Sequence, residues 1–442
     1  MQLKIVITGA LALVSSVLFA QQEAGLYFMP NLWQSVRTNP AVMTDEELTV
    51  FLPGIQSTLG ITGATLNDFI EGEKDGRPQI NVDQAIVKLD AQNLIRNDLT
   101  IETIGVGIKK GNFYLSFGHA FRYLAYLDYP KTLPQVVWQG NAQFVGQNVA
   151  LGNDLQLTGF SEFAFGASFQ AGNLTLGARA KYLSGIGNIS TDANHQTASL
   201  FTDPDVYQLT LRADYLLHTA GALDYENYKN LDLQFDFGKA SADLLFSKNS
   251  GYAFDLGARW TAGPLQLSAS VIDLGAQINW KKDVRNYRSA GEFNYNGLDF
   301  SNALTGDSVG FGAALDTLQS IFNVTETGTA YSTPIPAKIY IGASFQLANV
   351  TLHGLFFTES YRTRTFPAFS VGAQTALGQR FTVGANYTLL PELDRYANVG
   401  AQATAKLGPF QIYATTDNLG AIFRPGNSHA LSGRAGINWV IK

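Results

Sequence analysis

The sequence predicts an all-β chain that forms one antiparallel transmembrane β-barrel of about 14 strands, with long extracellular loops and short periplasmic turns. Composition is the first reason: charged residues make up 15% of the 442 residues, against 43 Gly, 29 Phe and 19 Tyr. Soluble domains usually carry about a quarter charged residues, whereas Gly and aromatic residues suit strands that are apolar on one face. The other two reasons are a recurring hairpin pattern and a period-two alternation along its arms.

The first 20 residues have the pattern of a cleavable signal peptide. Lys4 supplies a positive charge, an apolar stretch follows from Ile5 to Leu18, and Ala20 is the small residue at the expected cleavage point. A membrane anchor is the alternative, but the apolar run is short for a spanning helix. We expect cleavage near Ala20–Gln21, a periplasmic or lumenal segment over residues 21–46, and a barrel over residues 47–442.

The hairpin pattern places an apolar-alternating arm on both sides of a short turn rich in Gly, Asn or Pro. The six turns lie at residues 110–112, 171–173, 262–264, 348–349, 378–379 and 408–409. Six hairpins supply 12 strands, and two further strands are expected near residues 47–60 and 430–441. The total of 14 is even, as in bacterial single-chain barrels.

The alternation gives each arm an apolar and a polar face. In one arm Leu176, Ala178 and Ala180 share a face, while Arg179 and Lys181 share the other. A secreted β-sandwich or repeat protein would also alternate, but charges recur on the polar face in strand after strand, as a wet lumen requires. The candidate lumen-lining residues are Arg179, Lys181, Asp255, Arg259, Gln374, Gln402, Lys406 and Arg434. They would either line a conductive path or form a neutralised network that fills the interior.

The connections opposite the turns are unequal in length. Residues 61–98, 126–159, 187–250 and 276–337 form long ones, and residues 361–366 and 391–395 brief ones. Ile86, Leu89 and Leu94 are compatible with a short amphipathic helix in the first. Residues 206–219 and 233–246 are strand-like. We favour a surface hairpin for this pair over two further spans, which would make 16 strands.

Seven glycines lie at similar distances from the turns: Gly107, Gly166, Gly257, Gly342 and Gly372 before a turn, and Gly177 and Gly384 after one. One interpretation is that they relieve crowding in a closed, tilted sheet. The other is that a ring of missing side chains makes room for residues 21–46 inside the periplasmic mouth.

Motifs for chemistry are absent from the sequence. The five His residues are scattered singly, without metal-ligand spacing, and no nucleophile elbow or phosphate-binding loop occurs. The chain has no Cys, which excludes disulfides, thiolate catalysis and a lipid-modified Cys. The net charge of −6 gives no sign of a nucleic-acid partner. We therefore expect no catalytic, cofactor-binding or metal-binding residues and no enzymatic activity.

Several phrases carry a family resemblance: Asn39-Pro40-Ala41 after the signal peptide, Leu52-Pro53-Gly54 in the first strand, Asp273-Leu274-Gly275 with Trp280, and Asp417-Asn418. Over essentially the whole mature chain, this pattern resembles uncharacterised Bacteroidota outer-membrane barrels that bear a domain of unknown function. It is more distantly similar to fatty-acid-transporter-like (FadL) barrels and to the PorV and PorP/SprF components of type IX secretion. The resemblance implies a 14-stranded barrel with an N-terminal segment near the lumen. Residues 21–46 are shorter than the hatch of the fatty-acid transporters, and the chain lacks their terminal aromatic residue.

Two functions follow as expectations for this outer-membrane protein. In the first, the barrel is a transporter or channel for small or hydrophobic molecules. In the second, it is a non-enzymatic assembly or anchoring partner of surface or type IX secretion proteins, contacting them through its long loops. Outer-membrane lipid is the expected partner in both.

Overall fold

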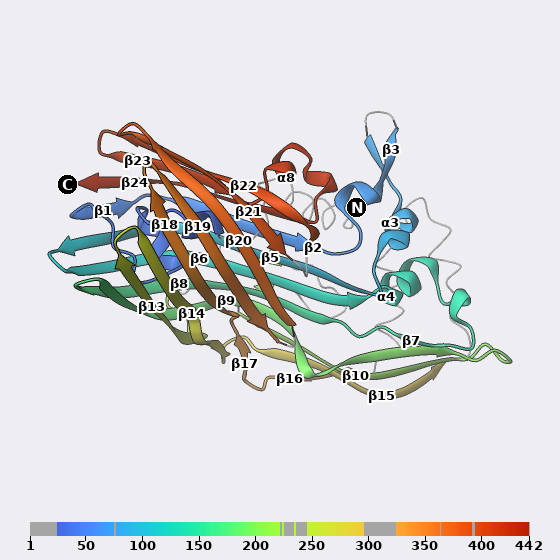
Figure 1. The fold of residues 1–442 in the computed structure, drawn as a ribbon. Coiled ribbons are helices and arrows are strands. Elements are labelled where there is room, and N and C mark those ends of the chain that lie inside the picture. The colour runs from blue at the N-terminus through green and yellow to red at the C-terminus, as the bar shows by residue number, and fades with distance from the viewer. Residues whose placement is uncertain are drawn as a thin grey trace.

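The computed structural model describes residues 24–74, 77–221, 223–224, 234–235, 245–295, 324–362, 364–390 and 394–441. Within these residues the chain forms a closed antiparallel barrel of 14 strands (Figure 1). The predicted signal peptide, residues 1–20, lies outside the described residues.

The first barrel strand is interrupted at Leu52 and Pro53 and consists of β1 (Leu48–Phe51) and β2 (Gly54–Ile61). The other barrel strands are β5 (Gln92–Lys110), β6 (Phe113–Pro130), β8 (Asp154–Ala171), β9 (Leu174–Thr202), β13 (Ser250–Ala262), β14 (Leu265–Trp280), β18 (Ala337–Leu347), β19 (Val350–Tyr361), β20 (Arg364–Leu377), β21 (Phe381–Leu390), β22 (Asp394–Leu407), β23 (Phe410–Thr416) and β24 (Ala430–Ile441). Each pairs with the next, and β24 pairs with β1 and β2, so the ring closes without an edge. The prediction of 14 strands is confirmed.

The six predicted turns join β5 to β6, β8 to β9, β13 to β14, β18 to β19, β20 to β21 and β22 to β23. They gather at one end of the barrel, which we call the turn end; the opposite end is the loop end (Figure 1). Five of the turns contain a Gly with φ between +56° and +68°, a region that Gly enters without steric cost. Ala348 takes φ +51° in the β18–β19 turn.

Three strands extend beyond the barrel at the loop end and form a sheet that we call the blade. They are the outer part of β9, β10 (Leu209–Gly221) and β15 (Arg285–Tyr295), with the short β7 (Asn148–Ala150) and β16 (Thr325–Thr327) beside them. Leu200, Leu209 and Leu211 pack together on one face. In the blade the hydrogen bond from His195, together with Arg288, holds the pKa of Asp214 below its usual range.

The blade contains one of the two strands expected in the third long connection. The strand expected at residues 206–219 exists outside the barrel wall as β10, which pairs with β9 and β15. Residues 233–246 lie largely outside the described part of the chain; Gln234–Phe235 (β12) pair with Leu223–Asp224 (β11). The connections are also shorter than expected, because the barrel strands remain paired past the predicted boundaries.

The first long connection contains the expected helix, α3 (Val82–Lys88), which packs Ala85 and Ile86 against Leu89. Leu94 belongs to β5 instead. The remaining elements of the loop end are η2 (Leu66–Phe69), β3 (Ile70–Lys74), β4 (Arg77–Ile80), α4 (Thr132–Pro134), η3 (Gln135–Gln139), η4 (Ala142–Phe144), β17 (Tyr331–Pro334), α8 (Leu419–Phe423) and η6 (Pro425–Asn427).

The outer face of the barrel is apolar. Leu176, Phe254, Ile341 and Val371 point outward and are 50–60% exposed. A set of aromatic side chains, each 40–58% exposed, lies within a few residues of the turns: Phe113, Phe169, Trp260, Phe345, Phe381, Phe410 and Trp439. Such a girdle is typical of the water–lipid boundary of a transmembrane barrel. Among the described residues, no helix has the length and apolar character needed to cross a membrane.

Candidate functional site

The lumen near the turn end is filled by residues 24–46, which we call the plug. It contains α2 (Ala24–Tyr27) and η1 (Trp33–Arg37), joined by a turn whose residue Asn31 is exposed. Leu26, Trp33 and Ala41 have no exposed surface, so the plug is packed like a protein core. Its other end continues directly into β1.

Two glycines of the wall lie directly against the Asn39–Ala41 segment of the plug. A Cβ atom added at Gly177 would lie 2.2 Å from the Pro40 carbonyl oxygen, and one at Gly257 would lie 2.2 Å from Asn39 Oδ1. Real Cβ atoms do not approach other atoms so closely, so the plug sits where these side chains are missing.

Gly342 faces the plug alone, since an added Cβ there would lie 2.6 Å from the ring of Tyr27. At two more of the seven glycines an added Cβ would meet both wall and plug: at Gly107 the Tyr114 hydroxyl at 2.1 Å and Trp33 at 2.7 Å, and at Gly372 the Ala385 carbonyl at 2.9 Å and Phe28 at 3.1 Å. Gly166 and Gly384 adjoin wall side chains instead, Arg179 and Gln402 among them. These two fit the crowding interpretation.

The Asn39-Pro40-Ala41 motif fixes the plug against the wall. Asn39 Oδ1 accepts a hydrogen bond from the Ala41 amide at 2.9 Å, which forms a tight local turn. The Pro40 carbonyl accepts one from Ser168 at 2.5 Å, and the adjacent Thr38 carbonyl accepts one from Ser270 at 2.6 Å. The motif therefore has a structural role in seating the plug on β8, β9, β13 and β14.

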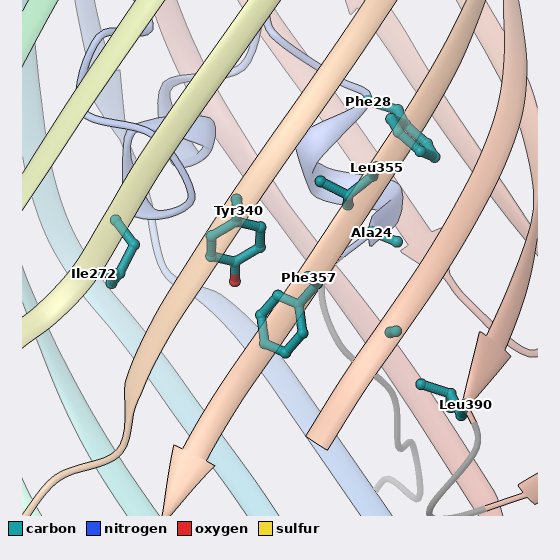
Figure 2. Packing of buried hydrophobic residues seen from close by; sticks show 8 residues of the cluster. Ala24, Phe28, Ile272, Tyr340, Leu355, Phe357 and Leu390 are labelled. Carbon is teal, nitrogen blue, oxygen red and sulfur yellow. The ribbon is translucent and has the colours of Figure 1, made fainter. Parts of the chain in front are cut away.

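Aromatic side chains complete the seating on the other strands. Trp33 packs on Phe51 with ring centroids 4.3 Å apart, and Phe28 stacks on His353 at 4.9 Å. Figure 2 shows Ala24 and Phe28 of the plug within a buried cluster formed by Ile272, Tyr340, Leu355, Phe357, Ala368 and Leu390 of the wall.

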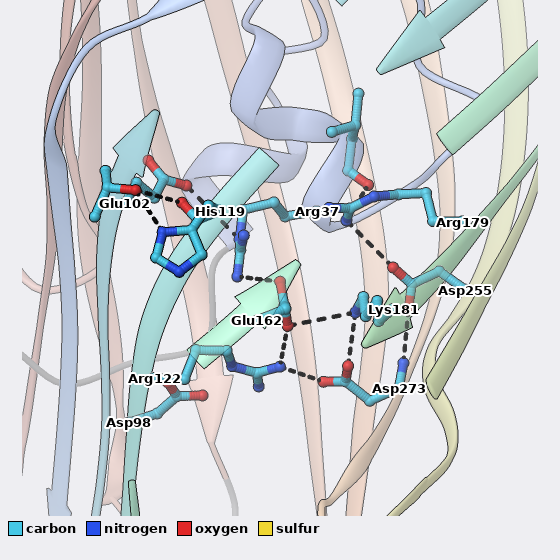
Figure 3. Close-up of polar contacts among 12 residues, drawn as sticks. Arg37, Asp98, Glu102, His119, Arg122, Glu162, Arg179, Lys181, Asp255 and Asp273 are labelled. Carbon is cyan, nitrogen blue, oxygen red and sulfur yellow. Dashed lines mark hydrogen bonds and ion pairs between the residues drawn. The ribbon is translucent and has the colours of Figure 1, made fainter. Parts of the chain in front are cut away.

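Next to the plug, farther from the turn end, charged side chains of the wall form a buried network (Figure 3). Lys181 Nζ lies 2.6 Å from Asp273 Oδ1 and 2.7 Å from Asp255 Oδ1. Arg122 Nη1 lies 2.8 Å from Glu162 Oε2 and 3.0 Å from Asp273 Oδ2. This layer brings together residues from β6, β8, β9, β13 and β14.

Two further ion pairs extend the network around the wall. Arg179 Nη1 lies 3.2 Å from Asp255 Oδ2, and Arg434 Nη1 lies 2.7 Å from Glu102 Oε1. The wall thus contributes four cations (Arg122, Arg179, Lys181, Arg434) and four carboxylates (Glu102, Glu162, Asp255, Asp273). These charges balance one another without the plug.

The plug inserts Arg37 between the two parts of this network. Its Nη2 lies 3.1 Å from Glu162 Oε1, and its Nε lies 3.6 Å from Glu102 Oε1. The space left beside Arg37, Arg122 and Asp273 is about 20 Å³, room for about one water molecule. In this conformation the lumen is closed at the network.

A bulge in β14 explains why Asp273 belongs to the network. Strict alternation would point it toward lipid, because Ser270 and Ile272 face the lumen. The β13–β14 register shifts between Phe254 and Leu256, and Asp273 takes φ +60°. Its amide then donates to Asp255 Oδ1 at 2.8 Å, and its carboxylate turns inward.

Of the predicted lumen-lining residues, Arg179, Lys181, Asp255 and Arg434 thus lie in the network. Sequence reasoning missed Arg37, Glu102, Arg122, Glu162 and Asp273 as site residues. For Arg122 and Glu162, a charge inside an otherwise apolar-alternating strand is the signal that would have found them.

The other four predicted residues lie beside the plug at the turn end. Arg259 and Gln374 line a cavity of about 340 Å³ between the plug and β13, β14, β18, β19 and β20. Gln374, Gln402 and Lys406 line a cavity of about 270 Å³ that continues toward β22 and β23. The plug therefore leaves two cavities at the turn end, between its tip and β13–β23, a region that we call the hollow side.

Buried polar atoms without a hydrogen-bond partner among the described residues occur on both sides of the lumen; Trp33 Nε1, Arg122 Nε and Arg179 Nη2 are examples beside the network. Those on β19 to β23 are His353 Nε2, Gln374 Oε1, Asn386 Oδ1, Asn398 Nδ2, Gln402 Oε1, Gln402 Nε2 and Thr415 Oγ1. Leaving such a group unpaired costs about 1–3 kcal/mol. Within the part of the chain that the structure describes, no group of three side chains suited to a metal ion occurs.

Residues 40–417 match the model of a family of unknown function, DUF5723. The chain belongs to this family. The match begins at Pro40, so it takes in the end of the plug and nearly the whole barrel. The search of curated proteins found no match.

The solved structures with a similar fold include outer-membrane barrels. A mutant of the monoaromatic hydrocarbon channel TodX is 9% identical, with a TM-score of 0.45, and the alignment covers 92% of this chain and 93% of that one. The Pseudomonas putida toluene transporter TodX is 11% identical over 96% and 93%, with a TM-score of 0.39. The autotransporter NalP translocator domain from Neisseria meningitidis is 10% identical over 96% and 99%, with a TM-score of 0.31. Similarity at this level leaves the function of this chain to be argued from its own residues.

Proposed function

We propose that this protein is a gated outer-membrane transporter or channel, in which the plug closes the lumen and has to shift before a small molecule passes. The observation that carries the proposal is how the plug closes the lumen: its Arg37 lies between Glu102 and Glu162, two carboxylates that also have cationic partners in the wall. Beside the plug, polar side chains line two cavities at the turn end.

The charge network supports the same function. If Arg37 leaves, Glu102 keeps Arg434, and Glu162 keeps Arg122 and Lys181. Losing one member of a buried ion pair usually costs about 3–5 kcal/mol, because the other charge is left uncompensated. Here the wall remains balanced, so an open lumen is electrostatically tolerable.

The outer membrane is the proposed location, with the turn end toward the periplasm, as in bacterial barrels generally. The aromatic girdle and the apolar outer face support it. The signal peptide and the Bacteroidota origin stay predictions. On a gel, unboiled and boiled samples should migrate differently if the barrel is stable in detergent. Equal mobility, with the protein in the soluble periplasmic fraction, would contradict the membrane location.

Conductance in planar bilayers tests whether solutes pass through the lumen. The wild-type chain should show brief, infrequent openings, and a variant that lacks residues 24–38 should conduct steadily, because most of the plug, Arg37 included, is gone. Heat-modifiable mobility of the variant verifies that the barrel still forms. A folded variant that passes no current would overturn the proposal and favour the anchoring role expected as the alternative.

A further inference from the structure

We propose that the hollow side of the lumen binds a small, hydroxyl-rich anion such as a sugar acid. This inference rests on the proposed function and names the substrate class of the same passage. The site is the space between the plug turn at Pro30 and Asn31 and the wall strands β13–β23.

The size of the site suits a small solute. The two cavities, about 340 and 270 Å³, share the lining residues Pro30, Asn31, Gln346, Thr351 and Gln374, so they adjoin one another around the tip of the plug. Ligand pockets typically measure about 300–1,000 Å³. Together the cavities accommodate a monosaccharide or disaccharide beside the plug.

The charges that line the site are positive. Arg259 lines the larger cavity, and Arg380 and Lys406 line the smaller one, whereas no carboxylate lines either among the described residues. Lys406 is paired with Glu46 at 2.7 Å. Neither Arg259 nor Arg380 has an ion-pair partner in the described chain; Arg259 Nη2 donates at 2.9 Å to the Gln266 side-chain oxygen. Each cavity thus offers one guanidinium group without an ion-pair partner, and a carboxylate binds such a group with charge-assisted hydrogen bonds.

The uncharged lining consists of groups that recognise hydroxyls. Gln374, Gln402 and His353 line the cavities, and each has a buried nitrogen or oxygen without a partner among the described residues. Side-chain amides both donate and accept hydrogen bonds, and a hydroxyl group does so as well. A ligand with several hydroxyl groups therefore satisfies such a lining better than a ligand whose groups only accept hydrogen bonds.

The same lining disfavours hydrocarbons. An apolar solute would displace water from amide, hydroxyl and guanidinium groups without replacing their hydrogen bonds, which is the costly case in polar sites. The substrate class therefore differs from the aromatic hydrocarbons named for TodX.

Isothermal titration calorimetry of the full chain in detergent tests the site with three probes of similar size. Glucuronate has both a carboxylate and hydroxyls, glucose has only the hydroxyls, and hexanoate has only the carboxylate. We expect glucuronate to bind at least about tenfold more tightly than either of the others. The Arg259→Gln/Arg380→Gln double variant should lose about tenfold in glucuronate affinity. Arg212→Gln, in the exposed blade pair with Glu292, should not change it.

The proposal is overturned if glucuronate shows no saturable binding, if glucose or hexanoate binds as tightly as glucuronate, or if Arg212→Gln weakens binding as much as the double variant. Calorimetry does not depend on conduction. If glucuronate binds to a barrel that never conducts, the proposed function is refuted and the binding site stands. If the barrel conducts but glucuronate does not bind, the binding site alone is refuted.

Discussion

At the scale of single residues, the wall is shaped for the plug as much by missing side chains as by present ones. Gly177 is the clearest case, since the Pro40 carbonyl occupies the place of its Cβ atom. Gly354, on β19, is a suitable comparison because an added Cβ there would meet nothing within 4 Å.

Gly177→Ala should displace the plug, because overpacking of this kind typically costs about 1–3 kcal/mol. The measurement is limited trypsin digestion of the folded protein, with cleavage after Arg37 followed by mass spectrometry. Cleavage should be faster in Gly177→Ala and unchanged in Gly354→Ala. Equal rates in wild type and both variants would contradict the close contact.

Asp273 neutralises two cations of the network, since it pairs with both Lys181 and Arg122. Asp273→Ala should destabilise the barrel by about 3–5 kcal/mol, because two buried cations lose a partner. The readout is the temperature at which unboiled gel mobility is lost. Asp214→Ala, which removes an exposed carboxylate of the blade, is the control and should have little effect. An equal effect of both substitutions would show that the network is not what stabilises the wall.

The residue scale also shows what strand alternation locates and what it misses. Arg179, Lys181 and Asp255 fall on the polar face of their strands, and all three are buried in the network. Asp273 was missed because the bulge turns its side chain to the opposite face of β14. A bulge depends on how β14 pairs with β13, and the sequence of β14 alone does not show this pairing. Arg37 was missed because the plug has no run of residues with helical or strand periodicity that is long enough to show which side chains point into the lumen.

At the scale of elements, plug and wall are two units that meet through two salt-bridge residues of the plug, Arg37 and Glu46, and many packing contacts. The wall strands are joined by continuous backbone ladders, whereas the plug is held by side chains and a few hydrogen bonds. Elements held in this way are expected to move before the sheet opens.

Arg37→Met should therefore loosen the plug and leave the barrel intact. Hydrogen exchange measured by mass spectrometry should show faster exchange in Trp33–Arg37, by about tenfold for a loss of 1.4 kcal/mol. Exchange in β5–β9 should match wild type, because the wall charges remain balanced. If the strands exchange faster together with the plug, the two are one cooperative unit and the separation is wrong.

Element prediction succeeded where local chemistry decides the structure. The turns were located because Gly at positive φ between alternating arms is a local signal. The pairing of β10 with β15 was not predicted, because residues 233–246 are nearer in sequence than β15, while this pairing is decided by packing across the blade.

At the scale of the whole molecule, the barrel holds a plug that leaves two cavities on the hollow side, between its tip and β13–β23. The closed ring follows from an even number of alternating strands and was predictable. The difference between the two sides of the lumen was not predictable, because it depends on how the plug lies inside the ring. The central claim is that this plug gates a passage.

A disulfide tests that claim most directly. A Cβ atom at Gly25 would lie 3.3 Å from Thr415 Cβ, close to the spacing of about 3.5–4.5 Å found in disulfides. The chain has no other Cys, and the plug already continues into β1, so Gly25→Cys/Thr415→Cys pins it at both ends. In planar bilayers the oxidised protein should pass no current, and adding a reductant to the same membrane should start channel openings. Equal current before and after reduction, or none in either state, would contradict a gated passage.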